Sequence, residues 1–167
     1  MKNKHLEHIE DHILEGKHGA INAINFLDTK QSQVSVKYDG APAIVYGTNP
    51  ENGKFFVGTK SVFNKRRIKI NYTHTDIESN HGHIPRVASI LHICLDRLPQ
   101  NDGIYQGDFI GYGGSDTHTP NTSTYKFDGV IDDIIVATHT QYIGATIQEL
   151  DAKFHYRESK SYGVHFI

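Results

Sequence analysis

A lysine, an aspartate and a glycine lie close together in the segment Val34-Ser35-Val36-Lys37-Tyr38-Asp39-Gly40. The β-branched residues favour a strand, on which Ser35 and Lys37 would share one face. A lysine amine attacks phosphorus only when it is neutral, which requires partial burial and nearby positive charge. The spacing therefore makes Lys37 a candidate nucleophile with the Asp39 carboxylate beside it. The alternative is an exposed strand lysine followed by an ordinary Asp-Gly turn.

Two later positions carry groups that suit phosphate chemistry. Lys60-Ser61 comes 23 residues after Lys37, and Asp108 comes 71 residues after it. The segment 60–69 has no acidic residue and contains five basic ones: Lys60, Lys65, Arg66, Arg67 and Lys69. Because the net charge is −2, attraction to phosphate would come from this local patch. A solvated charged loop is the alternative interpretation of the patch.

The elements that must position these residues follow from hydrophobic periodicity. Helical spacing of apolar residues predicts two N-terminal helices, over 4–15 and 18–28. The period then changes and predicts an antiparallel meander of three strands: 33–38, 43–48 and 54–60. Asn49 to Gly53 is a hairpin signal between the second and third strands, because asparagine and glycine tolerate the positive φ of a turn. Gly40-Ala41-Pro42 would form the tighter corner between the first two.

The second half of the chain predicts one more helix and further strands. Pro85 and Pro99 flank a helix over 84–98. Strands are expected at 104–110 and 131–137, with 142–146 as a further candidate strand, whereas 64–82 is polar and irregular and 111–124 is a connector rich in glycine, serine and threonine. The predicted class is α+β, with a mostly antiparallel sheet, N-terminal helices and one central helix. We expect one domain over 1–167, with a helical segment at 1–30 and a core at 31–167.

The order of these motifs resembles that of the covalent nucleotidyltransferases, the superfamily of ATP-dependent DNA and RNA ligases and capping enzymes. Lys37-Tyr38-Asp39-Gly40, the basic Lys60 closing a later strand, and Asp108 after a glycine resemble its motifs I, Ia and III. The chain is most similar to uncharacterised ligase-like proteins of large tailed phages, over most of its length. The similar segments are Val36–Ala43, Lys54–Val57, Val62–Lys65, Tyr105–Asp108, His5–Asp11, Pro120–Thr122 and Thr138–Thr140.

This resemblance implies a ligase adenylation-domain fold and a covalent reaction. Lys37 would attack the α-phosphate of ATP, release pyrophosphate and hold AMP as a phosphoramidate, with GTP as the other candidate nucleotide. Asp39 would orient the lysine or help to place metal-bound phosphate, and Asp108 would bind the ribose or Mg²⁺. The further nucleotide contacts that it implies are Gly40, Lys60, Ser61, Lys65 and His139. The nucleotide would pass to a DNA or RNA end held by the Lys60–Lys69 patch.

The sequence departs from the pattern of that superfamily late in the chain. The superfamily has glutamate where Asp108 stands, and its Glu-Gly motif IV is matched only by Asp128-Gly129-Val130-Ile131, 20 residues after Asp108. The paired lysines of motif V are absent, with Lys153 and Lys160 as the only late substitutes. These departures favour an alternative, a nucleotide- or nucleic-acid-binding module of the same fold without turnover. A third reading is a phage interaction protein whose histidine-rich helix docks a partner.

The remaining chemical groups predict no further site. The histidines His5, His8 and His12 on the first helix, and His74, His81, His83 and His92 later, lack a spacing typical of metal ligands, so a solvated surface is expected. Cys94 lies on the apolar stripe of its helix and is expected in the core. No stretch is apolar enough for a signal peptide or a membrane span. We expect a cytoplasmic protein, in a host cell if phage-encoded, and no pattern indicates its oligomeric state.

Overall fold

The computed structural model describes all residues except 1–3, 7, 29–35, 101–102, 156–158 and 162. The chain divides into two compact units. The first, which we call the helical unit, is His5–Lys37, and the second, the sheet unit, combines Met1–Lys4 with Tyr38–Ile167. The boundary thus follows residue 37, whereas the sequence suggested a division after residue 30. That both units belong to one domain stays a prediction.

The helical unit contains the two expected N-terminal helices. A 3₁₀-helix, η1, covers Ile9–Glu15, and α1 covers Lys17–Asp28. Gly16 separates them with φ +86°, in the left-handed region that glycine tolerates. The two helices pack closely at Gly19, where a Cβ atom would lie 1.9 Å from the carbonyl oxygen of His12. Glycine at this position therefore allows the helices to approach each other.

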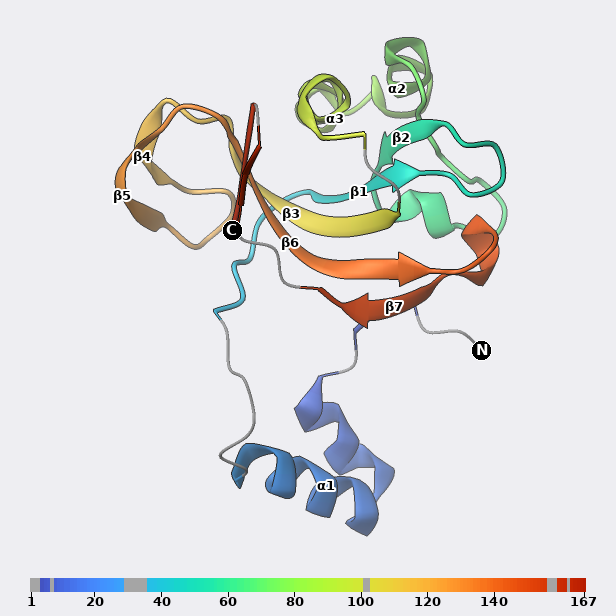
Figure 1. Cartoon of the computed structure of the whole chain (residues 1–167), viewed down its shortest axis with the longest axis vertical. Helices are drawn as coiled ribbons and strands as arrows, with labels where there is room; N and C mark the ends of the chain where they lie inside the picture. Colours follow the sequence, from blue (N-terminus) through green and yellow to red (C-terminus); the bar gives the residue numbers. More distant parts are fainter. Residues whose placement is uncertain (1–3, 7, 29–35, 101–102, 156–158, 162) are drawn as a thin grey trace. The chain divides into compact units, whose positions relative to one another are not determined.

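The sheet unit is built on a seven-stranded sheet with the order β2-β1-β3-β6-β9-β8, and β7 also pairs with β6 (Figure 1). The parallel pair is β6–β9, and the other pairs are antiparallel. These strands are β1 Ala43–Thr48, β2 Phe55–Gly58, β3 Ile104–Gly111, β6 Ile134–Ile143, β7 Asp151–Phe154, β8 Ser159–Ser161 and β9 Val164–Phe166. The predicted α+β class with a mostly antiparallel sheet is therefore confirmed.

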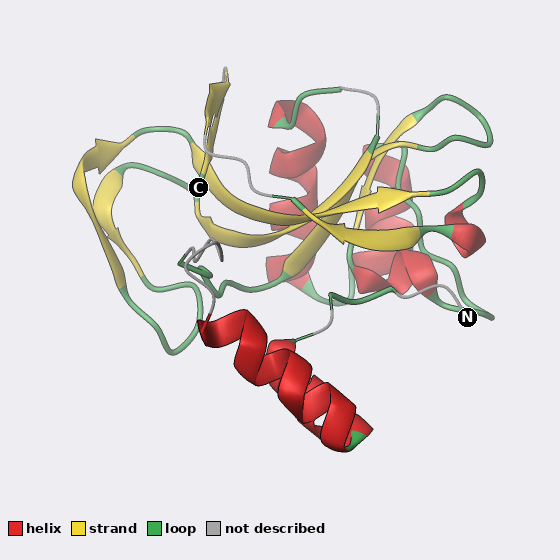
Figure 2. Ribbon diagram, turned by 60° about the horizontal axis from the view of Figure 1, so that its bottom comes forward, coloured by secondary structure: helices red, strands yellow, loops and turns green. Residues whose placement is uncertain are grey.

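A second, two-stranded sheet is formed by β4, Ser115–His118, and β5, Tyr125–Ile131. Both views show this hairpin at one end of the main sheet (Figures 1 and 2). The sequence predicted only a connector over 111–124 and a strand at 131–137. The observed β6 instead begins at Ile134 and continues to Ile143, so the two late apolar segments form one strand.

Helices α2, His74–His81, and α3, Pro85–Arg97, lie on one side of the main sheet (Figure 1). α3 is the expected central helix, and Pro85 stands in its first turn, where the missing N–H costs no hydrogen bond. α2 was expected to be irregular. It forms because Thr73 and Asp76 make a capping box, and because Ile77 is fully buried in the core. Cys94 is buried in the same core, as expected, and burial raises the pKa of its thiol.

The two faces of the main sheet are covered differently. The face under α2 and α3 holds the main core, which includes Ile44, Tyr46, Phe109 and Val136. The opposite face carries two separate apolar clusters. The first contains Val45, Phe56, Val62, Ile104, Tyr142, Ile147 and Leu150. The second contains Ile110, Ile131, Ile135 and Ala137, with Tyr38, Tyr125 and Phe127 packed against it. The centre of this face is therefore left to polar residues of β3 and β6.

Of three expectations for the first meander, the structure confirms one and changes two. The hairpin at Asn49 is confirmed, because β1 and β2 pair in antiparallel register across it. β2 ends at Gly58, however, and Lys60 begins a 3₁₀-helix, η2, over Lys60–Phe63. The strand expected at 33–38 falls partly outside the described residues, and 36–38 form no strand. Among the helices that the structure describes, none is long and apolar enough to cross a membrane.

Candidate functional site

Lys37 is exposed and lies outside regular secondary structure, so the expectations that it ends a strand and that it is partly buried are both wrong. It is the last residue of the helical unit. The other candidate residues of the sequence analysis, from Asp39 to His139, all belong to the sheet unit.

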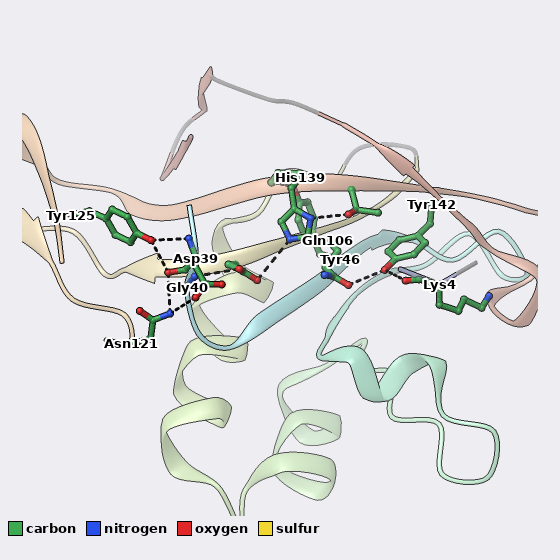
Figure 3. A network of polar contacts seen from close by, with 12 residues as sticks. Lys4, Asp39, Gly40, Tyr46, Gln106, Asn121, Tyr125, His139 and Tyr142 are labelled. Atoms are coloured by element: carbon green, nitrogen blue, oxygen red, sulfur yellow. Dashed lines mark hydrogen bonds and ion pairs between the residues drawn. The ribbon is translucent and has the colours of Figure 1, made fainter. Parts of the chain in front are cut away.

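Asp39 is held by two side chains from distant parts of the chain (Figure 3). Its backbone N–H donates to the Tyr125 hydroxyl at 2.8 Å, and that hydroxyl donates to the Asp39 carbonyl oxygen at 3.1 Å. The Asn121 amide donates to the Asp39 carboxylate at 2.8 Å and to its carbonyl oxygen at 3.2 Å. Asp39 is therefore fixed at backbone and side chain, although it is exposed. Sequence reasoning did not assign a role to Asn121 or Tyr125.

Gly40 brings the same segment directly onto β3. Its N–H donates to Oδ2 of Asp108 at 3.2 Å, and the next residue, Ala41, donates to the Phe109 carbonyl oxygen at 3.1 Å. A Cβ atom on Gly40 would lie only 2.5 Å from that same Phe109 oxygen. Position 40 therefore requires glycine because the two backbones approach so closely. The peptide bond that follows, Ala41–Pro42, is cis.

His139 reaches Asp108 because of a β-bulge. The register of β3 against β6 passes from Gln106↔Thr140 to Gly107↔Thr138, so His139 is the extra residue of β6. A bulge re-aims a side chain, and here Nε2 of His139 lies 3.8 Å from Oδ1 of Asp108. Nδ1 of His139 lies 2.8 Å from the Thr140 hydroxyl. The structure thus brings together Asp108 and His139, both predicted from the sequence.

Asp108, Gln106, His139 and Thr140 form a polar strip in the centre of the sheet face opposite α2 and α3. Asp108 is 7% exposed and Gln106 is 5% exposed, between the two apolar clusters described above. The amide oxygen of Gln106 accepts a hydrogen bond from Tyr142 at 2.8 Å, and burial raises the pKa of that phenol. Buried polar groups of this kind are costly unless they are paired. The hydrogen-bond donors and acceptors of the strip are therefore held in fixed positions.

The basic segment, residues 60–69, begins close to the polar strip. Val45 of β1 pairs with Gly58 on one side and with Gln106 on the other, so the end of β2 lies two strands, about 10 Å, from Gln106. η2 follows at once, and its Val62 is buried in the apolar cluster on the same face as the polar strip. Lys60 therefore starts a helix that packs on the face where Asp108 lies.

The other residues of the basic segment have different surroundings. Ser61 is held by Thr59, whose hydroxyl accepts the Ser61 N–H at 3.3 Å and contacts its hydroxyl at 2.8 Å. Lys65 is exposed, as are Arg66 and Arg67. Lys69 donates to the carbonyl oxygen of Asn80 at 2.7 Å and so supports α2. The patch available to phosphate therefore ends before Lys69.

Two of the late matches to motifs IV and V, Lys153 and Asp128, do not join the strip, and the side chain of Lys160 lies outside the described residues. Lys153 of β7 pairs with Gln141, which pairs with Tyr105. Directly paired residues share a face, and Tyr105 packs on the core under α2 and α3, so Lys153 projects from the face opposite to Asp108. It also forms an ion pair with Asp151 at 3.0 Å. Asp128, the motif IV match, lies exposed in β5.

The metal prediction concerns a single buried carboxylate. Within the ranges that the structure describes, no group of three or more histidine, cysteine, aspartate or glutamate side chains is arranged to hold a metal. Asp108 fits Mg²⁺ as one oxygen ligand, because a carboxylate offers about four lone-pair sites and Gly40 uses one. Mg²⁺ is commonly held by one or two carboxylates, with water and phosphate oxygens completing its shell.

Comparison with known proteins gives one match. The sequence model of a family described as "Family of unknown function (DUF6267)" matches residues 3–167, and the chain therefore belongs to this family. No curated protein and no solved structure matches the chain.

Proposed function

We propose that this member of family DUF6267 is a nucleotidyltransferase of the polynucleotide-ligase type, with the adenylation-domain fold. Lys37 would accept a nucleotide from ATP and pass it to a nucleic-acid end. The observation that supports the proposal is the 3.2 Å hydrogen bond from the Gly40 N–H to the Asp108 carboxylate. It joins the segment directly after Lys37 to the acidic strand, so two motifs far apart in the sequence meet in the sheet unit.

The covalent step follows from the chemistry of an amine and a phosphoanhydride. The neutral Lys37 amine attacks the α-phosphorus, and a nitrogen–phosphorus bond forms. The bond from that phosphorus to the oxygen bridging to the β-phosphate breaks, and pyrophosphate leaves with the electron pair. The proton lost by the amine passes to water. In the second step an oxygen of the nucleic-acid 5′-phosphate attacks the same phosphorus. The nitrogen–phosphorus bond breaks, and the lysine nitrogen leaves with the electron pair and takes a proton from water.

The sheet unit would supply the binding groups for this reaction. Lys60, which starts η2 on the face that carries Asp108, would bind the phosphates, with Ser61 and Lys65 following it. Asp108 and His139 lie 3.8 Å apart and offer a carboxylate oxygen and a ring nitrogen to the ribose hydroxyls. Mg²⁺ at Asp108 would neutralise charge on the phosphates. Asp39, fixed by Asn121 and Tyr125, would help to place metal-bound phosphate.

One observation favours the alternative function, a binding module of this fold without turnover. Lys153 is paired with Asp151 and projects from the face opposite to Asp108. Lys153 therefore does not bring to the polar strip the positive charge that motif V would place against the triphosphate. A module of this kind would bind nucleotide or a nucleic-acid end through the Lys60 segment and Asp108 without forming an adduct.

Radiolabelled nucleotides test the proposal. The chain is incubated with Mg²⁺ and with ATP labelled either in the α- or in the γ-phosphate, and then denatured. We expect protein-bound label from α-labelled ATP alone, since the γ-phosphate leaves in pyrophosphate. GTP is tried in parallel because the base is not fixed by any described contact. Nucleotide binding without bound label would support the module. No binding of either nucleotide would contradict the nucleotidyltransferase and would leave the module only a nucleic-acid end as its ligand.

A further inference from the structure

Two histidines outside the candidate site face each other between α2 and α3. Nδ1 of His74 lies 2.7 Å from Nδ1 of His92. The ring centroids are 4.9 Å apart and the ring planes differ by 27°. The two nitrogens therefore lie on the facing edges of the rings, at the distance of a hydrogen bond. The sequence analysis placed both residues in a loose surface cluster and did not predict this pairing.

The outer nitrogen of each ring faces a carboxylate. Nε2 of His74 lies 3.1 Å from Oδ1 of Asp96, and Nε2 of His92 lies 2.6 Å from Oε1 of Glu78. An ionised carboxylate only accepts hydrogen bonds, so both Nε2 atoms must carry hydrogen. The result is a chain of four side chains, Asp96, His74, His92 and Glu78, that alternates between the two helices.

The number of protons held in this row of four side chains gives the charge of the histidine pair. The two outer contacts need one N–H each, and the contact between the two Nδ1 atoms needs exactly one more. Two neutral imidazoles carry two N–H protons in total, whereas this arrangement holds three. The pair in this geometry therefore carries one positive charge, shared between two rings and flanked by two carboxylates.

We propose that His74 and His92 form a pH-responsive latch between α2 and α3, closed when the two rings share one extra proton. A fourth proton would set two N–H groups head to head at 2.7 Å, and loss of the third would set two lone pairs head to head. Both changes repel, so the latch weakens when pH moves in either direction from the singly charged state. α2 is the element it releases, a helix of eight residues held otherwise by its capping box and by buried residues such as Ile77.

The other charged groups of the two helices face elsewhere, so the pair is the titrating unit at this contact. Asp76 accepts from the N–H groups of Tyr72 and Thr73 at 3.0 Å each. β2, which packs against α3, contains no titratable residue. The remaining groups are His81, buried near Lys69 and His83; Arg86, which donates to the Pro120 carbonyl oxygen; and Arg97, which lies against Gly163.

Two measurements on the intact chain test the latch. Long-range proton–nitrogen correlation spectra across pH report which ring nitrogens carry hydrogen, and they should show the two rings exchanging one proton in a coupled titration. Amide hydrogen exchange reports the opening of α2. Because three of the four side chains are more than half exposed, we expect the latch to change the opening equilibrium by no more than about fivefold. We therefore expect α2 protection to pass through a maximum between about pH 5 and 8.

Variants separate the latch from ordinary surface pairs. His74→Asn and His92→Asn should each remove the protection maximum and leave the rest of the sheet unit unchanged. His8→Asn is the control, because His8 is an exposed histidine beside a carboxylate, 3.4 Å from Glu10, in the other unit. Independent titration of the two rings, or α2 protection that ignores pH, would overturn the latch. So would a maximum that disappears on adding EDTA, since the nitrogens would then bind a metal rather than a proton.

Discussion

The Asp108 carboxylate accepts a hydrogen bond from the backbone N–H of Gly40, 68 residues away in the sequence, at 3.2 Å. The contact depends on the backbone of residues 40–42 lying directly along β3. It connects the segment that follows Lys37 with the polar strip of Asp108 and His139.

Gly40→Ala should separate this segment from β3. The added Cβ would meet the Phe109 carbonyl oxygen at 2.5 Å, and backbone atoms cannot move away cheaply. We expect a loss of about 1–3 kcal/mol in the free energy of unfolding, measured with urea, and a loss of nucleotide binding. Gly53→Ala is the control, because position 53 has a positive φ but open space. Equal effects of the two substitutions on nucleotide binding would contradict the role of the close approach.

Asp108→Asn should weaken nucleotide binding without unfolding the protein. The substitution keeps the shape of a 7% exposed side chain and removes its charge, so the unfolding free energy should change by less than about 1.5 kcal/mol. Titration calorimetry with ATP and Mg²⁺ should show affinity reduced about tenfold or more, because the carboxylate is the expected ligand of metal or ribose. Asp132→Asn, at an exposed position, is the control. Unchanged affinity in Asp108→Asn would remove Asp108 from the site.

Tyr125→Phe should loosen Asp39. The substitution removes the hydroxyl that both accepts the Asp39 N–H and donates to its carbonyl oxygen. Because these groups are partly exposed, we expect only about 1 kcal/mol lower stability, together with slower label transfer from ATP. Tyr112→Phe, at a half-exposed phenol, is the matched control. A normal rate of transfer in Tyr125→Phe would show that the clamp on Asp39 has no part in the reaction.

His81 should make the sheet unit less stable in acid. It is 4% exposed, and among the described side chains its Nε2 is buried without a hydrogen-bond partner. Burial, with Lys69 and His83 nearby, lowers its pKa below the unfolded value of 6.5. The unfolded state therefore binds more protons as pH falls below about 6.5, and stability is lost in that range.

His81→Asn tests this dependence, because it removes the unpaired Nε2 and the titrating group together. Unfolding midpoints at pH 8 and pH 5 should differ less in the variant than in the wild-type chain. The same difference in both proteins would show that another group causes the acid sensitivity. The latch at His74 and His92 changes the amide hydrogen exchange of α2 and not only the global unfolding of the protein. The two effects can therefore be distinguished.

Helices and strands were predicted most accurately from the sequence where their local signals were strong. β1 was predicted with the observed bounds because β-branched residues precede the turn at Asn49, and α3 was predicted within one residue at each end by its flanking prolines. α2 was missed because its single large apolar residue, Ile77, gives no period. A signal existed, since Thr73 and Asp76 have capping-box spacing.

The candidate site was predicted in part for the same reason. Asp108 and Gly40 are brought together as the motif order suggested, because β1 pairs with both β2 and β3. The clamp of Asn121 and Tyr125 on Asp39 was missed because it joins residues more than 80 apart through the β4–β5 hairpin, whose first strand, β4, contains no apolar residue. The orientation of His139 depends on a bulge, and a shift of register leaves no mark in the composition of one strand.

Intact mass measurement after incubation with ATP and Mg²⁺ tests the role of Lys37 most directly. We predict a mass increase of one AMP that survives denaturation in the wild-type chain and in Lys17→Ala, an exposed lysine of the same helical unit. The increase should be absent in Lys37→Ala and Lys37→Arg, while both variants still bind ATP. An unmodified wild-type chain that binds ATP, or an adduct that persists in Lys37→Arg, would contradict the account.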